Sequence, residues 1–322
     1  MATYKEKVGT SVVNYAGNYP GAVDGELWYD STNKNFNYQY ANVTAAGSWR
    51  TGNGLNTKRR YLGSAGTQTA ALAFGGVDDS GPTVEDATEL YNGTNWTEVN
   101  DLNTARYSLG GAGTSTAALA FGGTPGSPYL NETELWNGTN WTEVNNLTTA
   151  RRYIGGTGTS TAALAFGGNT GSPVANTETW NGTNWTEVND LNQARSYLGG
   201  VGITTAALAF GGETPPNTGK TETWNGTNWT EVADLNTARA YVGSAGPSNT
   251  SALCFGGYST TFTANTEEWN GTSWTEVADL AIARYGVAGS GNVTAALAFG
   301  GYQPPGSDTT ATEEWTGAGA PV

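Results

Sequence analysis

The sequence predicts an all-β fold, a six-bladed β-propeller, from three observations. A phrase ending in Phe-Gly-Gly occurs six times at intervals of 44 to 47 residues, and a Trp recurs with the same period. Between copies the chain divides into four short strand-like segments separated by turn residues, which is the strand count of one propeller blade. The Phe residues are Phe74, Phe121, Phe166, Phe210, Phe255 and Phe299, and the Trp residues are Trp49, Trp96, Trp141, Trp185, Trp229 and Trp274.

Each strand is predicted from its residues, as the second unit illustrates. Residues 107–114 are mostly small, which suits the innermost strand, where neighbouring backbones approach closely. Residues 117–121 form an apolar second strand that two glycines end. Residues 133–136 and 140–144 form the third and fourth strands, and the Asn137-Gly138 pair between them is a strong hairpin signal.

The two ends of the repeat region complete one another. The last unit stops at residues 313–317 after a third strand, and the first repeat element, at residues 48–50, is a fourth strand. We expect this N-terminal strand to close the ring in the last blade, since closure removes an exposed edge. Residues 46–322 are then the propeller and residues 1–45 an attachment segment. The alternative is that a hairpin at residues 26–40 replaces part of the last blade.

Composition excludes several classes of function. The 322 residues contain no His, one Cys and one Met, which excludes Cys/His metal sites, a disulfide framework and imidazole catalysis. The 28 acidic and 14 basic residues give a net charge of −14, which repels nucleic acid and anionic lipid. The chain shows no signal peptide and no long apolar run. We expect no catalytic activity, cofactor, metal, nucleic-acid partner or membrane insertion.

The repeat resembles the kelch repeat over residues 47–317. The resemblance rests on the double Gly after the second strand, the aromatic residue after a Glu in the third strand, the Trp that opens the fourth strand, and the Arg that leads into the first. It implies a β-propeller with one four-stranded blade per repeat. It does not imply one function, because kelch-like propellers serve as enzymes, adaptors and structural parts.

A second resemblance concerns the source of the chain. Residues 25–36, G-E-L-W-Y-D-S-T-N-K-N-F, resemble a short module of bacteriophage tail and fibre proteins. The phrases A-A-L-A-F-G-G and W-N-G-T-N-W-T-E-V resemble those of kelch-like virion proteins of marine phages. The resemblance implies a virion protein, located in the phage particle, whose residues 1–45 bind other virion proteins.

One Arg stands immediately before the small-residue strand of every unit. Two roles are open for this ring: an ion pair with the Glu of the third strand, or an anion or carboxylate site at the mouth of the central channel. The candidate channel-mouth residues are Arg59, Arg106, Arg151, Arg195, Arg239 and Arg284, and the Glu residues are Glu89, Glu134, Glu178, Glu222, Glu267 and Glu313.

Other repeated or clustered residues also have two interpretations. The Trp residues either pack between blades or form sugar-stacking platforms. The Asn-Gly pairs supply hairpin turns or resemble glycosylation acceptors. The acidic loop with Asp78, Asp79, Glu85 and Asp86 is either solvated or a Ca²⁺ site.

The repeats differ mainly in the loop between the second and third strands. These loops are residues 77–87, 124–131, 169–176, 213–220, 258–265 and 302–311. In an up-and-down blade they lie on one face, together with the connections between blades. Variation confined to one face is typical of a recognition surface, and neutral drift gives the same pattern. The candidate contact residues are Tyr129, Leu130, Tyr258, Phe262, Tyr302 and Gln303.

The sequence therefore favours a bacteriophage virion structural protein, in a tail, fibre or capsid appendage, that displays a propeller. The displayed face would recognise a glycan or protein of the host surface or contact other virion proteins. The alternative is a multivalent carbohydrate-binding lectin with equivalent sites between blades. An enzyme is the least favoured class.

Overall fold

The computed structural model describes residues 13–15, 27–38, 47–79 and 83–318. The chain divides into two units, one of residues 1–45 with 318–322 and one of residues 46–317. All regular secondary structure in the described residues is β-strand, so the predicted all-β class is confirmed. No helix with the length and apolar character needed to cross a membrane occurs in this part of the chain.

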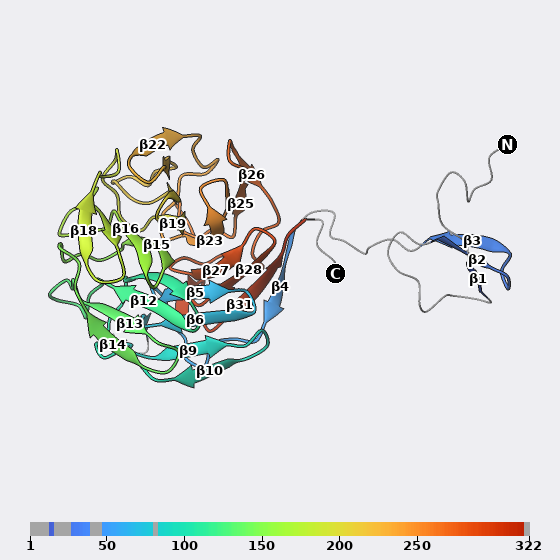
Figure 1. The fold of residues 1–322 in the computed structure, drawn as a ribbon, viewed down its shortest axis with the longest axis horizontal. Helices are drawn as coiled ribbons and strands as arrows, with labels where there is room; N and C mark the ends of the chain where they lie inside the picture. Colours follow the sequence, from blue (N-terminus) through green and yellow to red (C-terminus); the bar gives the residue numbers. More distant parts are fainter. Residues whose placement is uncertain (1–12, 16–26, 39–46, 80–82, 319–322) are drawn as a thin grey trace. The chain divides into compact units, whose positions relative to one another are not determined.

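Six four-stranded antiparallel sheets surround one axis in the unit of residues 46–317, which confirms the six-bladed propeller (Figure 1). The innermost strands are β5 (Gly63–Thr67), β11 (Gly110–Thr114), β15 (Gly155–Thr159), β19 (Gly199–Ile203), β23 (Gly243–Ser248) and β27 (Ala288–Asn292). The second strands are β6 (Ala70–Phe74), β12 (Ala117–Phe121), β16 (Ala162–Phe166), β20 (Ala206–Phe210), β24 (Ser251–Phe255) and β28 (Ala295–Phe299).

The other two strands of each sheet complete the blades, which we number 1 to 6 in the order of their innermost strands. The third strands are β9 (Thr88–Tyr91), β13 (Thr133–Trp136), β17 (Thr177–Trp180), β21 (Thr221–Trp224), β25 (Thr266–Trp269) and β31 (Thr312–Thr316). The outermost strands are β10 (Trp96–Val99), β14 (Trp141–Val144), β18 (Trp185–Val188), β22 (Trp229–Val232), β26 (Trp274–Glu276) and β4 (Ser48–Gly52).

The residues of the two inner strands follow from how closely the blades pack. A Cβ atom on Gly111 would lie 2.5 Å from the carbonyl oxygen of Ser64 in the preceding blade, so Gly111 has no room for a side chain, and the equivalent residue in blades 1 and 5 is the small Ser64 or Ser244. The second strand is covered on both faces by neighbouring blades, and Leu119 and Phe121 have no exposed surface. A strand buried on both faces is a continuous apolar run instead of an alternating one. This explains the repeated A-A-L-A-F phrase.

A Trp of the outermost strand joins each blade to the preceding one. The ring of Trp141 lies 5.0 Å from that of Phe74, and its Nε1 donates a 3.0 Å hydrogen bond to Thr88 Oγ1. The same Trp–Phe contact and Trp–Thr bond recur at the other five interfaces. Packing between blades is therefore confirmed. Five of these Trp residues are only 5 % exposed, which excludes them as sugar-stacking platforms, whereas Trp49 is partly exposed.

The Asn-Gly pairs form the turns between the third and fourth strands. Gly138 has φ +91°, and Asn137 Oδ1 accepts hydrogen bonds of 2.9 Å from the N–H groups of Thr139 and Asn140. The corresponding pairs in the other complete repeats make the same bonds. The turn interpretation is confirmed.

The N-terminal strand closes the ring as predicted. β4 pairs antiparallel with β31, with Trp49 opposite Trp315, and in Figure 1 the blue β4 lies beside the red strands of blade 6. β1 (Val13–Tyr15), β2 (Leu27–Asp30) and β3 (Asn35–Tyr38) form a sheet of their own, in which β1 is parallel to β2. The hairpin at 26–40 therefore replaces no part of blade 6, and that alternative is wrong. The rest of the predicted attachment segment, residues 1–12, 16–26 and 39–45, lies outside the described residues.

The closing seam between blades 6 and 1 carries polar contacts of its own. Arg50 in β4 pairs with Glu314 in β31, and the Tyr91 hydroxyl of blade 1 donates a 2.7 Å hydrogen bond to Glu314 Oε1. Leu or Thr stands at the position of Glu314 in four of the other third strands. A partly buried polar network specifies one pairing better than apolar contacts do. We infer that this network favours pairing of β4 with β31 over the four third strands that carry Leu or Thr, whereas β25 carries Glu268 at this position.

Deleting residues 312–322 should destabilise the ring sharply, because it removes β31 and leaves the edges of β28 and β4 unpaired. The melting temperature, followed by circular dichroism, should fall by at least 10 °C, in the range that a loss of a few kcal/mol produces, or the protein should aggregate. Deleting residues 318–322 alone is the matched control and should change little. A normal melting curve for the longer deletion would contradict this mode of closure.

Candidate binding face

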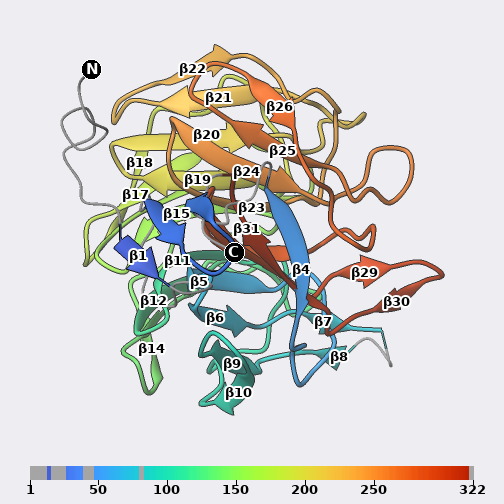
Figure 2. The same cartoon turned by 90° about the vertical axis from the view of Figure 1, so that its right-hand side faces the viewer.

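The variable loops and the connections between blades lie on one face of the propeller, which we call the loop face. The backbones of Arg60, in a connection, and Val77, in a loop, exchange hydrogen bonds of 3.0 and 3.1 Å, and an equivalent bridge recurs in every blade. Figure 2 shows two short hairpins of these loops extending from the same side of the ring. They are β7 (Val77–Asp78) with β8 (Thr83–Val84), and β29 (Tyr302–Gln303) with β30 (Ser307–Asp308).

The six arginines of the predicted channel-mouth ring are buried instead of exposed on this face. Each guanidinium pairs with the Glu of the third strand in the same blade, for example Arg195 Nη2 with Glu222 Oε1 at 3.0 Å. The pairs are Arg59–Glu89, Arg106–Glu134, Arg151–Glu178, Arg195–Glu222, Arg239–Glu267 and Arg284–Glu313. All six arginines have no exposed surface, so none of them can meet an anion at the channel mouth.

These pairs organise the connection that precedes each innermost strand. Glu222 also accepts hydrogen bonds from the backbone N–H and the Nδ2 of Asn192, at 2.7 and 2.8 Å. Burial lowers the pKa of Arg284 to about 10, while the charge of Glu313 opposes the shift, and the guanidinium stays protonated at neutral pH. Breaking one partner of such a pair leaves a buried charge, whereas the intact pair mainly fixes the local geometry.

A closed belt of six backbone hydrogen bonds encircles the axis on the loop face. The N–H of Ser108 donates to the carbonyl of Tyr61 at 2.8 Å, and each belt residue repeats this step until the N–H of Tyr61 donates to Gly286 at 3.0 Å. The belt residues are Tyr61, Ser108, Tyr153, Tyr197, Tyr241 and Gly286, all with φ between 56° and 65°. This left-handed conformation costs a residue with a side chain about 1–2 kcal/mol. Gly286 adopts the same conformation without strain, so the belt backbone does not require a tyrosine. We infer that the belt tyrosines are present because of the contacts that their rings make.

Tyrosine rings gather at the axis above the inner strands. The ring of Tyr61 lies 6.0 to 6.5 Å from five other Tyr rings, and Tyr153 stacks on Tyr197 at 3.6 Å. Burial raises the pKa of Tyr61 and Tyr197, and that of Tyr241 to about 12, so these hydroxyls are protonated at neutral pH. Cavities of 110, 130 and 150 Å³ follow along the inner strands, and no arginine lines them. None of these tyrosines is among the predicted site residues, although a Tyr two residues after the repeated Arg in four repeats signals the cluster.

Three of the predicted contact residues gather beside this cluster. Tyr258, Phe262 and Tyr302 surround Tyr285, with Phe262 stacked on Tyr285 at 5.3 Å and an interplanar angle of 8°. The rings of Tyr258 and Tyr302 lie 6.1 and 5.4 Å from that of Tyr285. Tyr258 is 37 % exposed and the other three are partly exposed. The loop face therefore continues the axial aromatic cluster outward.

The other three predicted contact residues differ from one another. Tyr129 is partly exposed, and its ring covers the Arg152 guanidinium at 4.7 Å. Leu130 is only 7 % exposed and offers little contact surface, because its side chain packs inward while its N–H bonds the Gly123 carbonyl at 2.8 Å. Gln303 is partly buried in β29, opposite Ser307.

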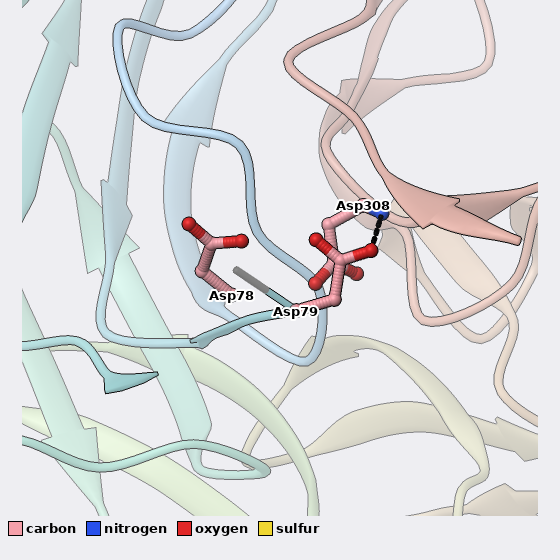
Figure 3. Close-up of side chains that lie close together, drawn as sticks. All are labelled: Asp78, Asp79 and Asp308. Atoms are coloured by element: carbon pink, nitrogen blue, oxygen red, sulfur yellow. Dashed lines mark hydrogen bonds between the residues drawn. The ribbon is translucent and has the colours of Figure 1, made fainter. Parts of the chain in front are cut away.

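Three carboxylates meet where the loops of blades 1 and 6 touch, as Figure 3 shows. Asp78, Asp79 and Asp308 have oxygens within 4.8 Å of one another. Lys58 Nζ lies 2.6 Å from Asp79 and 3.3 Å from Asp78, and Arg60 Nη1 donates to both oxygens of Asp308 at 2.7 and 2.9 Å. The hydrogen bond from Lys58 lowers the pKa of Asp79. The cluster therefore links two loops through the chain's own cations, and the other two acidic residues of the predicted Ca²⁺ loop do not belong to it.

Replacing one buried arginine tests its structural role. Arg195→Ala should lower the free energy of unfolding by about 3–5 kcal/mol, because Glu222 is left buried without a counter-charge. Urea unfolding followed by Trp fluorescence measures the change. The double variant Arg195→Met with Glu222→Met should lose less than the single variant, and Lys220→Ala, which removes only exposed ion pairs, should lose less than about 1 kcal/mol. Equal stability of Arg195→Ala and the parent chain would contradict the role.

The comparisons with protein families and with curated proteins identify no relative of this chain. No protein-family model matches the chain, and no curated protein shows significant similarity to it. Neither comparison supports the resemblance to kelch repeats or to phage virion proteins.

Proposed function

We propose that this chain is a non-catalytic display protein whose loop face binds a molecule on the surface of a host cell. One observation carries the proposal: the axial tyrosines and the aromatic residues of two variable loops gather on the same face. Partly exposed aromatic residues provide a large contact area and lose little conformational entropy on binding. The near-identical strands provide a rigid support on which loops vary without disturbing the interfaces between blades.

The proposal includes a location in the bacteriophage virion, in a tail, fibre or capsid appendage. It is supported by the resemblance of residues 25–36 and of the repeat phrases to phage virion proteins. It is also consistent with the division of the chain, because residues 1–45 belong to a unit separate from residues 46–317. In this proposal residues 1–45 bind other virion proteins, and the propeller is the displayed part.

A lectin with one equivalent site at each blade interface has less support. Such sites need exposed aromatic residues that repeat around the ring, but Trp96, Trp141 and Trp185 are each 5 % exposed. Tyr258, Phe262 and Tyr302 come from loops that differ in every blade. The partly exposed tyrosines that do repeat, such as Tyr153 and Tyr197, gather in one cluster at the axis and not at the separate blade interfaces. One binding face therefore fits the structure better than six equivalent sites.

Replacing the variable loops tests the proposed recognition. In each blade, the first residue of the variable loop, which forms the backbone bridge to the connection, is kept. The residues from there to the start of the third strand are exchanged for a short Gly/Ser/Asn turn. The fluorescently labelled full-length variant should keep its melting temperature and lose binding to a panel of marine bacterial cells, because loop tips provide the contacts while strands provide stability. The measurement is flow cytometry.

The matched control replaces the hairpin turns between the first and second strands, for example residues 115–116, on the opposite face. This variant should bind as the parent chain does. Equal cell binding by the variant with exchanged loops would show that the loop face is passive.

Screens for glycosidase, esterase and oxidase activity should stay at background, because the chain has no His and the six buried third-strand Glu residues are held in ion pairs. The measurement is product release from chromogenic substrates and from surface polysaccharides. Reproducible hydrolysis that disappears when one Asp or Glu is replaced would show that the chain is an enzyme.

A further inference from the structure

Arg60 and Arg152 occupy the same position of the repeat, directly after the buried arginine of blades 1 and 3. The Arg60 guanidinium lies over two rings, 4.8 Å from the centre of Tyr302 and 5.5 Å from that of Tyr61. Tyr302 belongs to the loop of the preceding blade and Tyr61 to the belt. Arg60 Nη1 donates hydrogen bonds of 2.7 and 2.9 Å to the two oxygens of Asp308.

Arg152 has the same surroundings without the carboxylate. Its guanidinium lies 4.7 Å from the ring centre of Tyr129, in the loop of the preceding blade, and 4.6 Å from that of Tyr153, in the belt. Among the described residues no carboxylate lies within 4.0 Å of it, although every other Lys and Arg in the described part of the propeller has one. The buried Nε makes no hydrogen bond to any described residue in either arginine, so the difference between Arg60 and Arg152 is the carboxylate. On a chain of net charge −14, a basic group without an acidic partner is an exception.

We propose that Arg152, held between Tyr129 and Tyr153, binds the carboxylate of an acidic saccharide. This inference rests on the proposed function and names the ligand class of one site on the loop face. The ion pair between Arg60 and Asp308 indicates which ligand group suits Arg152. It places a carboxylate against the guanidinium of the arginine that holds the equivalent position in blade 1. The chain provides that carboxylate in blade 1, and the ligand provides it in blade 3.

The chemistry of the site favours a carboxylate over other anions. A guanidinium is a planar fork of N–H donors that matches the two oxygens of a carboxylate. The two tyrosine rings hold this fork in place, so binding orders fewer side-chain torsions. The net charge of −14 repels an approaching anion, but salt screens exposed charges farther away than a Debye length of about 8 Å at physiological ionic strength, so the nearby guanidinium dominates for a carboxylate at Arg152.

The aromatic surroundings favour a saccharide over an acidic peptide. Tyr153 stacks on Tyr197 at 3.6 Å, so aromatic surface continues from the guanidinium toward the axis. A sugar ring presents C–H groups on one face and can lie against such a surface while its carboxylate reaches Arg152. An acidic peptide side chain brings the carboxylate on a flexible stem and leaves the rings without a matching flat partner.

The test measures binding of trigalacturonate to the full-length chain by isothermal titration calorimetry. Trigalacturonate should bind, and the neutral trigalactose should bind at least tenfold more weakly. Arg152→Gln should weaken trigalacturonate binding at least tenfold, and Arg152→Lys should also weaken it, because an ammonium group lacks the planar fork. Arg60→Gln is the matched control. It should change the affinity for trigalacturonate less than twofold, since the Arg60 guanidinium is already hydrogen-bonded to Asp308.

Two variants of Tyr129 keep the proposal testable if Arg152→Gln lowers the melting temperature. Tyr129→Ala removes the covering ring and should weaken binding several-fold. Tyr129→Phe retains the ring and should bind as the parent chain does. Equal binding by Tyr129→Ala and Tyr129→Phe would contradict the role of the stacked ring.

Each remaining outcome decides one part of the inference. Unchanged trigalacturonate binding by Arg152→Gln overturns the site, and a triaspartate peptide that binds as tightly as trigalacturonate overturns the saccharide class. If Arg152→Gln keeps full cell binding while the variant with exchanged loops loses it, the display function stands and this inference fails. If the variant with exchanged loops keeps cell binding, the proposed function itself fails, whatever Arg152 does with trigalacturonate.

Discussion

The contact on which the rest of the propeller depends is the insertion of each outer-strand Trp into the preceding blade. Trp141 packs on Phe74 and bonds Thr88, and the other five interfaces repeat this arrangement. No blade buries both of its own faces, so each sheet becomes stable only between two neighbours. A chain of such blades must either close or leave two apolar faces and one strand edge exposed. Closure by β4 against β31 follows from that constraint.

The same constraint explains why stability and variation lie in different parts of the repeat. The interfaces require the apolar second strand, the Trp, and the buried Arg–Glu pair, and these residues hardly change between repeats. The loops contact the blades mainly through backbone hydrogen bonds, such as those between Arg60 and Val77, which place little demand on side chains. Loop sequence is therefore free to respond to a ligand. The strained belt tyrosines are an exception on the same face, since their conformation is unfavourable and their rings gather at the axis.

Arg151 and Arg152 show how strongly the environment decides the role of a residue type. Arg151 has no exposed surface and pairs with Glu178, so it is part of the framework. Arg152, the next residue, lies between two tyrosine rings with no carboxylate near it in the described structure, so it retains its capacity to bind an anion. The ring of arginines predicted as an anion site is the framework set, and the candidate for anion binding is its neighbour.

The sequence by itself determined the all-β class, the six blades, their strand order and the closure of the ring. These follow from a period, from turn residues such as Asn137-Gly138 and from the missing strands at the two ends, all of which are local or periodic properties. Only the tertiary structure decided that the Arg ring is buried, that Leu130 packs inward and that Arg60 has a carboxylate partner while Arg152 has none among the described residues. These facts depend on side chains brought together from different blades. Asp308 and Arg60 lie 248 residues apart, so no local pattern reports their contact.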